Sequence, residues 1–339
     1  MTTISDVARL AGVSPATVSR VLNRPEIVVA AKREKVLAAI QELGFEPSAS
    51  ARSLRTGSSR SIALLVGDIS QSFHGTLAKS VATEAEAAGY SLLLGDLDHR
   101  RDRLLDFLRS IVRRNVDGVV IATAEDITDP EVSAAIGKLV ASGVAVVSTV
   151  QGVPDLKVPR VAMDYRAMGD HAIRHLVEQG RRHLVYAGAG RSPYSQMVES
   201  GVRDAADGAG AHLAVVDAAF QLAPAREAIR GLLAGGERID GVVAANTPIA
   251  IGALRGLAEA GLSVPGDVAL ISCESVPTAD FVSPSLSTIG CDLAEYGRAA
   301  ARTVIGAIEG RPVDDDIQLA FELVVRESSA SPRDHEPVA

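Results

Sequence analysis

The chain has 339 residues, 47% of them hydrophobic and 22% charged, with two cysteines and a formal net charge of −8. This length exceeds one ordinary domain, and two cysteines are too few for a disulfide-dense secreted fold, so Cys273 and Cys291 are expected to be free thiols. No apolar stretch is long enough to cross a membrane and the N-terminus lacks the pattern of an export signal, which together favour a cytoplasmic protein.

The first residues predict a short helix that ends at a glycine. Its apolar positions repeat at intervals of three and four, and so fall on one face: Ile4, Val7, Ala8 and Ala11. Thr3 or Ser5 can cap its N-terminus, and Gly12 tolerates the left-handed conformation that ends a helix. The short turn Gly12-Val13-Ser14 then leads into a second helix.

The second helix is expected over residues 15–22, with Ser14 as its cap. Val18 and Val21 would face inward, and the outer face would carry small, hydroxylated and basic side chains: Pro15, Ala16, Thr17, Ser19 and Arg20. Small residues allow close approach to bases, hydroxyls reach phosphates and arginine can grip guanine, so this helix suits a DNA major groove. An ordinary helical hairpin with a polar outer face is the alternative.

Charge is distributed unevenly along the chain. Residues 1–60 contain nine Lys and Arg against five Asp and Glu, a net of +4, so the total of −8 leaves −12 for residues 61–339. A basic module on an acidic protein is expected where the module docks on phosphates and the remainder stays off the duplex.

The residues of the two helices also carry a family resemblance. The run from Thr3 to Ser14, continued from Ala16 to Asn23, resembles the headpiece of the lactose-repressor (LacI/GalR) family of bacterial transcription regulators. Residues 33–47 resemble the family's third helix, although Val29 stands where a capping serine is usual. The resemblance implies a DNA-binding transcriptional repressor with these contact residues: Thr3, Ser14, Pro15, Ala16, Thr17, Ser19, Arg20, Asn23, Ala51 and Leu54.

Residues 47–54 resemble the hinge helix that in this family forms on operator DNA and inserts a leucine pair into the minor groove. Leu54 would be that wedge, because an apolar side chain can unstack a base step, and Ser48 departs from the family's usual asparagine. Residues 48–61 are rich in Ala, Ser, Arg and Gly, with Leu54 as the one large apolar group, which is too little to fold alone. A plain flexible linker is the alternative.

From residue 62 onward, apolar runs of four to six residues alternate with amphipathic stretches, which is typical of parallel α/β sheets. Strands are expected at 62–66, 90–94, 118–122, 144–149, 184–187, 241–245 and 268–273. Helices are expected at 74–88, 101–114, 170–179, 224–233 and 248–260, among others. Nearly 280 residues are too many for one modest sheet, so two sheets that share one cleft are expected.

The predicted fold class is an all-α helix-turn-helix headpiece followed by a two-lobed α/β domain with two parallel, doubly wound sheets. The resemblance implies lobes like those of periplasmic sugar-binding proteins, with crossings near residues 150–161, 290–292 and 320–323. The expected boundaries are a headpiece at 1–46, a hinge at 47–61, a core at 62–326 and a disordered tail at 327–339. Within the core, the N-lobe takes about 62–150 and 291–320 and the C-lobe about 161–290 and 321–326.

Open α/β lobes bind ligands at the carboxyl ends of their strands, so the residues just after each strand are candidates for an effector site. The expected effector-binding residues are Asp68, Gln71, Phe73, Thr149, Val198, Phe220, Asn246 and Glu274. Phe73 and Phe220 could stack on an apolar ring face or could simply be packing, while Asn246 and Glu274 could fix hydroxyls or ring nitrogens.

Compared with the family's pattern, this site lacks charged donors. Val198 stands where many members have an effector-binding arginine, Gln151 replaces the arginine of a usual Asp-Arg pair, and Thr247 replaces a common aspartate. The effector is therefore expected to be a small neutral sugar, polyol or nucleoside rather than a phosphorylated or carboxylated compound. A regulator that no longer binds a small molecule is the alternative.

Two features that invite other functions are weak. His171 and His175 are one helical turn apart without a third metal ligand, and the run Gly188-Ala189-Gly190 lacks the third glycine of a phosphate loop. No catalytic residue, metal or cofactor is predicted, so the chain is not expected to be an enzyme. A periplasmic solute-binding protein would share residues 62–326 but has no use for a basic headpiece.

The expected oligomeric state follows from DNA recognition. One headpiece makes few base contacts, so specificity requires two half-sites and a homodimer on a pseudo-palindromic operator. The tail lacks the leucine heptads that the family uses for tetramers. The expected partners are duplex operator DNA, a small-molecule effector and a second copy of the chain, without a membrane.

Overall fold

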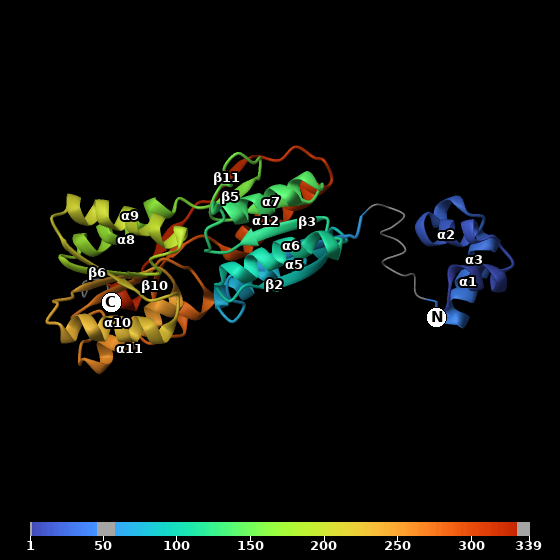
Figure 1. Ribbon diagram of the computed structural model, residues 1–339. Coiled ribbons are helices and arrows are strands. Elements are labelled where there is room, and N and C mark those ends of the chain that lie inside the picture. Colours follow the sequence, from blue (N-terminus) through green and yellow to red (C-terminus); the bar gives the residue numbers. More distant parts are fainter. Residues whose placement is uncertain (1, 46–57, 331–339) are drawn as a thin grey trace. The chain divides into compact units, whose positions relative to one another are not determined.

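The computed structural model describes residues 2–45 and 58–330 of the chain. The protein consists of two compact units, residues 1–59 and residues 60–339. The first unit is helical, and the second contains two α/β lobes (Figure 1).

The first unit is a helical headpiece, as predicted. It consists of α1 (Ile4–Ala11), α2 (Pro15–Asn23), the 3-10 turn η1 (Pro25–Ile27) and α3 (Ala30–Leu43). Val7 of α1, Val18 of α2 and Val36 of α3 are fully buried and belong to one apolar cluster. Each helix therefore turns one apolar face inward and leaves its polar face outside.

The helix ends have the chemistry that the sequence predicts. Thr3 caps α1, because its hydroxyl accepts the backbone N–H of Asp6 and the Asp6 carboxylate accepts the Thr3 N–H at 2.9 Å. Gly12 ends α1 at φ +66°, a left-handed conformation that a Cβ disfavours. Ser14 caps α2, whereas Val29 provides no side-chain cap for α3. The turn between α1 and α2 is thus held at both of its ends.

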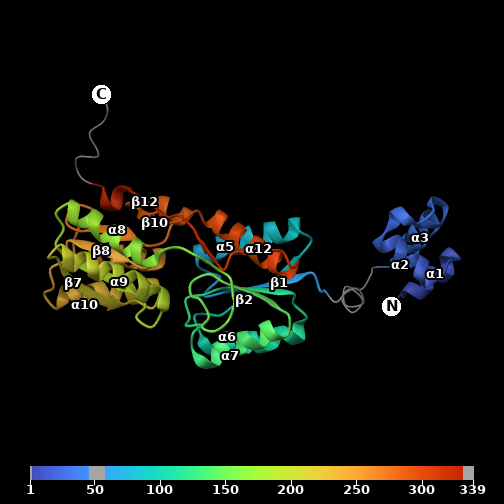
Figure 2. The same cartoon turned by 90° about the horizontal axis from the view of Figure 1, so that it is seen from above.

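The first lobe of the second unit is built on a six-stranded parallel sheet, in the order β11-β5-β4-β3-β1-β2. Its strands are β1 (Ser61–Val66), β2 (Ser91–Asp96), β3 (Gly118–Ala122), β4 (Ala145–Ser148), β5 (Arg160–Ala162) and β11 (Asp316–Gln318). One face is covered by α5 (Ser72–Ala87) and α12 (Leu293–Ile308), the other by α6 (Arg101–Arg114) and α7 (Pro130–Ala141) (Figure 2). Successive β1 side chains alternate between these layers: Ile62 and Leu64 join one apolar cluster, Ala63 and Leu65 the other.

The second lobe repeats this architecture with a sheet in the order β12-β10-β9-β8-β6-β7, in which only the β10–β12 pair is antiparallel. Its strands are β6 (His183–Gly188), β7 (His212–Asp217), β8 (Gly241–Ala244), β9 (Ala269–Ser272), β10 (Ser287–Gly290) and β12 (Glu322–Val324). Its helices pack in two pairs, α8 (Tyr165–Glu178) with α9 (Pro193–Gly208) and α10 (Leu222–Ala234) with α11 (Thr247–Glu259). The predicted pair of doubly wound sheets is confirmed.

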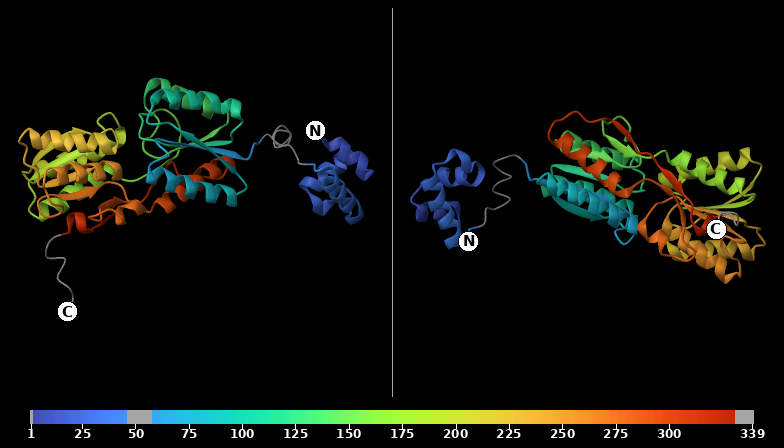
Figure 3. Two further views of the ribbon diagram at one scale, coloured as in Figure 1. Left: turned by 90° about the horizontal axis from the view of Figure 1, so that it is seen from below. Right: turned by 180° about the vertical axis from the view of Figure 1, so that it is seen from behind.

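The chain passes between the lobes three times: after β5, between β10 and α12, and between β11 and β12. As a result α12, drawn in orange, lies beside α5, drawn in cyan, although the two are far apart in the sequence (Figure 3). Strand β5 pairs with β4 and β11, so it belongs to the first sheet. The C-lobe, which is predicted to start at about residue 161, therefore begins after Ala162, the last residue of β5.

The predicted disordered tail begins too early. Residues Glu327–Ser329 form the 3-10 turn η3, in which Ser328 and Ser329 are fully buried. The Ser328 hydroxyl donates to the Leu270 carbonyl at 2.7 Å, and the Ser329 hydroxyl donates to the Ser287 hydroxyl at 2.7 Å. The composition of the tail predicts disorder for these serines, but hydrogen bonds to β9 and β10, and not apolar burial, hold them in place.

The seven strands and five helices expected from the sequence are present within a few residues. The prediction missed the short strands β5, β11 and β12, each of three residues, because periodicity cannot be read over so short a run. It also missed β7, an edge strand with no buried residue, and β10, whose four residues include a serine and a threonine.

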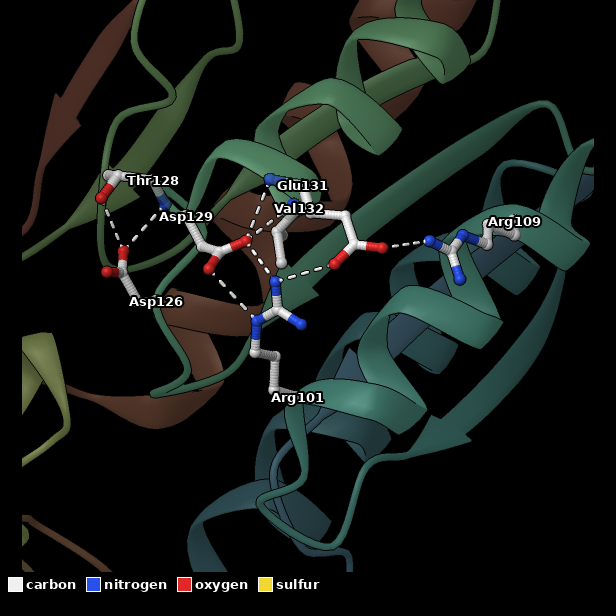
Figure 4. Close-up of polar contacts among 7 residues, drawn as sticks. All are labelled: Arg101, Arg109, Asp126, Thr128, Asp129, Glu131 and Val132. Atoms are coloured by element: carbon white, nitrogen blue, oxygen red, sulfur yellow. Dashed lines mark hydrogen bonds and ion pairs between the residues drawn. The ribbon is translucent and has the colours of Figure 1, made fainter.

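Surface ion pairs join α6 to the start of α7 (Figure 4). The Arg101 guanidinium lies 2.6 Å from the Asp129 carboxylate and 3.0 Å from that of Glu131, and Arg109 also contacts Glu131. Asp129 in addition caps α7 by accepting the backbone N–H groups of Glu131 and Val132. Exposed ion pairs each contribute little, so the cap is the more important of these contacts.

Candidate functional sites

The outer face of α2 is exposed, as the sequence predicts for a DNA-contacting helix. Pro15, Ala16 and Arg20 are exposed on it, whereas Val18 and Val21 are buried on the opposite face. Small groups and one guanidinium therefore form a surface that a major groove can approach closely.

Hydroxyl groups at the starts of α1 and α2 are held in place by capping contacts. The Ser14 hydroxyl accepts the backbone N–H of Thr17 at 3.2 Å and lies 3.0 Å from the Thr17 hydroxyl. The Thr3 hydroxyl donates to the Asp6 carboxylate at 2.6 Å. Helix N-termini attract phosphate in general, and DNA contacts by Thr3, Ser14 and Thr17 stay a prediction.

The remaining predicted DNA contacts are Ser19, Asn23, Ala51 and Leu54. Ser19 is half-buried on α2, and Asn23 is the last residue of that helix. Ala51 and Leu54 lie outside the residues that the structure describes, so the minor-groove wedge stays a prediction.

A pocket lies within the second unit, between its two lobes and at the carboxyl ends of their strands. It encloses about 640 Å³ of empty space, a volume that includes the open solvent at its mouth. Six of the eight predicted effector residues line it: Gln71, Phe73, Thr149, Phe220, Asn246 and Glu274.

Asp68 and Val198 are not part of the pocket lining. The Asp68 carboxylate accepts the Ser70 N–H at 2.9 Å and the Gln71 amide N–H at 3.4 Å. These hydrogen bonds stabilise the loop after β1, outside the pocket lining. Val198 is fully buried in α9, where the helix crosses α8 so closely that a Cβ on Gly169 would lie 2.2 Å from the Val198 carbonyl. The family position of an arginine is thus filled here by a residue of the lobe's core.

Two tyrosines tie the lobes together at the base of the pocket. The Tyr165 hydroxyl, on α8, donates to the Thr149 carbonyl at 3.0 Å, and the Tyr296 hydroxyl, on α12, donates to the same carbonyl at 2.5 Å. The two tyrosine oxygens lie 3.2 Å apart. Thr149 follows β4 directly, and its own hydroxyl donates to the Ile121 carbonyl at 3.2 Å.

The C-lobe side of the pocket is organised around the ends of β8 and β9. The Tyr194 hydroxyl lies 2.7 Å from the carbonyls of both Ala245 and Cys273. Asn246 caps α11 by accepting the Ile249 N–H at 3.0 Å. These contacts fix the backbone that presents the Asn246 amide to the pocket.

Glu274 is the acidic residue of the pocket lining. Its Oε2 accepts the backbone N–H of Thr247 at 3.0 Å, at the start of α11. Burial raises the pKa of Glu274 to about 7, and the hydrogen bonds from Thr247 oppose that shift only in part. The carboxyl group therefore titrates near neutral pH in the empty pocket.

Contacts across the mouth hold the two lobes close to each other. The Gln71 amide donates to the Phe220 carbonyl at 3.4 Å, and the Ser192 hydroxyl donates to the Ala124 carbonyl at 3.0 Å. The His99 ring lies 5.4 Å from the Phe220 ring, while its Nδ1 contacts a Glu125 carboxylate oxygen at 3.2 Å. Opening of the cleft would break the Gln71–Phe220, Ser192–Ala124 and His99–Phe220 contacts, which join the two lobes.

Several lining residues were not singled out from the sequence. Tyr165 and Tyr296 lie in the first turns of helices that follow β5 and β10, two strands that the sequence reading missed. The same rule, which takes the residues after each strand, finds both tyrosines once those strands are known. His74 and His99 come from α5 and from the loop after β2, where no pattern distinguishes them.

The described residues contain neither a potential metal site nor a membrane-spanning helix. No three His, Cys, Asp or Glu side chains come together as a potential metal site in residues 2–45 and 58–330. Within the same residues, no helix has the length and apolar character that a membrane span needs.

Family models match both units of the chain. The model for bacterial regulatory proteins of the lacI family matches residues 3–48, and that for a periplasmic binding protein-like domain matches residues 173–329. The ribose operon repressor of Halalkalibacterium halodurans is 32% identical over 97% of each chain. The transcriptional regulator GalR of Escherichia coli is 29% identical over 98% of this chain and 96% of its own.

Solved structures agree with these relatives. The Lac repressor dimer bound to operator and an anti-inducer matches with a TM-score of 0.87 at 22% identity, over 97% of this chain and 99% of that chain, which shows the shared fold. The cellobiose complex of the regulator CelR matches with a TM-score of 0.70 at 27% identity, over 97% of this chain and 100% of the other. With an exposed α2 on a helical headpiece, a pocket between two α/β lobes, and a relative 32% identical over nearly its whole length, the chain belongs to the LacI family of bacterial transcription regulators.

Proposed function

We propose that this regulator binds a pseudo-palindromic operator as a homodimer through α2, and that a small molecule in the pocket changes its affinity for DNA. The observation that carries the DNA-binding part is the exposed outer face of α2, with Pro15, Ala16 and Arg20 above a buried Val18. A single headpiece reads few bases, so a second copy is needed for useful specificity. Since its target is the chromosome, we expect it in the bacterial cytoplasm.

The effector is proposed to be a sugar, a polyol or a nucleoside. Among relatives, one is named a ribose operon repressor, and another, from Enterococcus faecium, was solved with bound ribose. The described residues that line the pocket include no arginine and no lysine, which disfavours phosphate and carboxylate ligands. Aromatic side chains such as Phe73 and Phe220 offer faces for the apolar side of a ring.

The DNA-binding proposal is tested with the full chain and genomic DNA fragments. Bound fragments are selected, and Kd is measured by fluorescence anisotropy for a selected site and for unrelated duplex. We expect Arg20→Ala to weaken operator binding by about 1–3 kcal/mol with little effect on unrelated duplex, because a base contact carries sequence information and a phosphate contact does not.

A matched control is Arg203→Ala, which removes an exposed arginine of α9 in the other unit. This variant should leave both affinities unchanged. If Arg20→Ala weakened binding to both DNAs equally, Arg20 would be a phosphate contact, and if the full chain selected no fragment the DNA-binding proposal would fail.

A further inference from the structure

Aromatic residues are concentrated in the pocket. The chain has six Phe, five Tyr and no Trp, and five of these eleven rings line the pocket: Phe73, Tyr165, Tyr194, Phe220 and Tyr296. The Tyr165 and Tyr194 rings lie 5.0 Å apart, and Tyr194 lies 6.2 Å from Phe220. In the first lobe, on the other side of the pocket, the Phe73 ring lies 6.2 Å from the Tyr296 ring. The Tyr165–Tyr194 and Phe73–Tyr296 pairs pack edge to face, and aromatic rings attract cations as well as apolar groups.

The tyrosine hydroxyls meet a ligand only as hydrogen-bond acceptors. Tyr165 and Tyr296 donate to the Thr149 carbonyl, and Tyr194 donates to the Ala245 and Cys273 carbonyls. Each hydroxyl has one proton, so its remaining capacity is its lone pairs.

Other polar groups of the pocket also accept. The Thr123 hydroxyl lines the pocket, is buried, and has no hydrogen-bond partner among the described residues. His74 donates from Nδ1 to the Asp68 carbonyl at 2.9 Å, which leaves its Nε2 as an acceptor when the ring is neutral. Asn246 retains its NH₂ group as a donor, because its oxygen is used in the cap of α11. The pocket lining thus offers several acceptors to a ligand that donates hydrogen bonds, among them the tyrosine lone pairs, the His74 Nε2 and the Glu274 carboxylate, while the Thr123 hydroxyl can either donate or accept.

The charged groups of the pocket also favour a ligand that donates hydrogen bonds, because its described lining includes a carboxyl group and no cation paired with it. Glu274 lies on the wall with no Lys, Arg or His within salt-bridge distance in the described residues, and its one bonded oxygen accepts a backbone N–H. Burial lowers the pKa of His74 to about 4, so this ring is neutral at physiological pH. His99 pairs with Glu125. Burial raises the pKa of Cys273, Cys291 and Tyr165 to about 12. It also raises the pKa of Tyr194 and Tyr296 well above the usual value for tyrosine, so all five groups stay protonated and uncharged.

The mouth of the cleft is also acidic. Four carboxylates and two guanidinium groups line it: Glu125, Asp126, Asp129, Asp217, Arg101 and Arg191. Arg101 is itself paired with Asp129 and Glu131. A negative rim raises the local concentration of cations and disfavours anions.

On the basis of the effector site proposed above, we propose that the effector of this regulator is a sugar- or polyol-sized molecule with a protonated amine that pairs with Glu274 inside the aromatic wall. An ammonium group has three donors and no acceptor, which matches the acceptor-rich pocket. Its positive charge also compensates the buried carboxylate, which no side chain of the pocket does. This proposal replaces the neutral effector expected from the sequence with a cationic one.

Proton exchange gives the ligand a characteristic pH dependence. The Glu274 carboxyl group has a pKa of about 7, so it is mostly protonated below that pH. A cationic ligand binds the ionised carboxylate, and binding therefore releases the proton. Affinity for an amine should therefore rise about tenfold per pH unit below pH 7 and level off above it. A neutral polyol has no reason to follow this profile.

The test compares ligands that differ only in charge. The probes are N-methylglucamine against sorbitol and choline against 3,3-dimethylbutan-1-ol, because N-methylglucamine and choline both stay positively charged at pH 8. Each is added to the full chain at pH 6 and pH 8, and binding is measured by the shift in melting temperature and by saturation-transfer NMR, which detects millimolar affinities. The variants are Glu274→Gln and, as a matched control, Glu322→Gln on the exposed edge strand β12.

We expect at least one amine to bind more tightly than its neutral partner, with a larger effect at pH 8 than at pH 6. Glu274→Gln should remove this preference about tenfold or more, whereas Glu322→Gln should keep it. Neutral partners that bind as well as the amines, an amine preference that survives in Glu274→Gln, or no binding by any probe would each overturn the proposal. DNA binding by the same preparation, measured alongside, tells this failure apart from a failure of the proposed function.

Discussion

At the scale of single residues, two buried ionisable groups of the pocket respond to pH in opposite directions. The pKa of Glu274 rises from 4.5 to about 7 on folding, and that of His74 falls from 6.5 to about 4. Both shifts have burial as their largest cause, because a low-dielectric site disfavours the charged form of either group. Because both groups are buried in their uncharged forms, the stability of the folded chain depends on pH.

The sign of each effect follows from proton linkage. Between pH 4.5 and 7 the folded chain holds the Glu274 proton more tightly than the unfolded chain, so this group's stabilisation is lost as pH rises through that window. Below pH 6.5 the unfolded chain takes up a proton at His74 that the folded chain accepts only near pH 4, so stability falls as pH falls. The two effects oppose each other between pH 4.5 and 6.5.

A difference measurement separates them. We expect Glu274→Gln to unfold with a free energy that exceeds that of the parent by an amount growing from pH 4.5 to pH 7, by at most about 1.4 kcal/mol per pH unit. The amide still accepts the Thr247 N–H, so the local contact is kept. Urea unfolding at four pH values gives this difference. A difference that does not change with pH would show that Glu274 is not shifted.

At the scale of elements, the α8–α9 pair depends on glycines at its crossing. A Cβ on Gly201 of α9 would lie 1.9 Å from the Arg166 carbonyl, and one on Gly169 of α8 would lie 2.2 Å from the Val198 carbonyl. These neighbours are backbone atoms, which cannot rotate away as a side chain can. The two helices could accommodate a methyl group only by moving apart.

We therefore expect Gly201→Ala to destabilise the second unit by about 3 kcal/mol or more, the upper range for overpacking. The matched control is Gly208→Ala in the same helix, where a Cβ would meet nothing within 4 Å. That change should be neutral or stabilise by up to about 1 kcal/mol through helix propensity. Thermal unfolding of the two variants provides the comparison, and equal melting temperatures would contradict the close crossing.

Elements were recognisable from the sequence where they are long or where their ends have a chemical signature. Thr3 and Gly12 indicate the two ends of α1, and Ser14 indicates the start of α2, because each of these residues caps a helix end. The amphipathic spacing of α6 is also a local signature and indicates its bounds. Strands β5, β7 and β10 lack such local signatures, since their pairing partners, which lie elsewhere in the sequence, are what make them strands.

At the scale of the whole molecule, the pocket draws on segments from both lobes. Tyr165, Tyr296 and Thr149 meet at the base, and Gln71 meets Phe220 at the mouth. A ligand that binds here contacts both lobes and so favours one lobe arrangement over another. If that arrangement alters DNA binding, the two sites are coupled by a free energy that is the same in either direction.

This coupling can be measured from either side. For a probe that binds the pocket, we expect operator DNA to change the probe's Kd by the same factor by which the probe changes the Kd for operator, with unrelated duplex as the control DNA. Calorimetry of the probe, with and without operator, and anisotropy of the operator, with and without the probe, give the two factors. Factors of one would show that the pocket does not control DNA binding, whereas unequal factors would show that one of the two titrations had not reached equilibrium.

The sequence by itself determined the headpiece, the two-lobe architecture and six of the eight pocket positions that it named. It could do so because caps, turns, apolar periodicity and the strand-end rule all operate over a few neighbouring residues. Only the tertiary structure decided that Val198 is core, that Ser328 and Ser329 are buried, and that Tyr165, Tyr296, His74 and His99 join the pocket. Those outcomes depend on contacts between separate segments of the chain, such as Ser328 with Leu270 and Tyr165 with Tyr296, which no local pattern encodes.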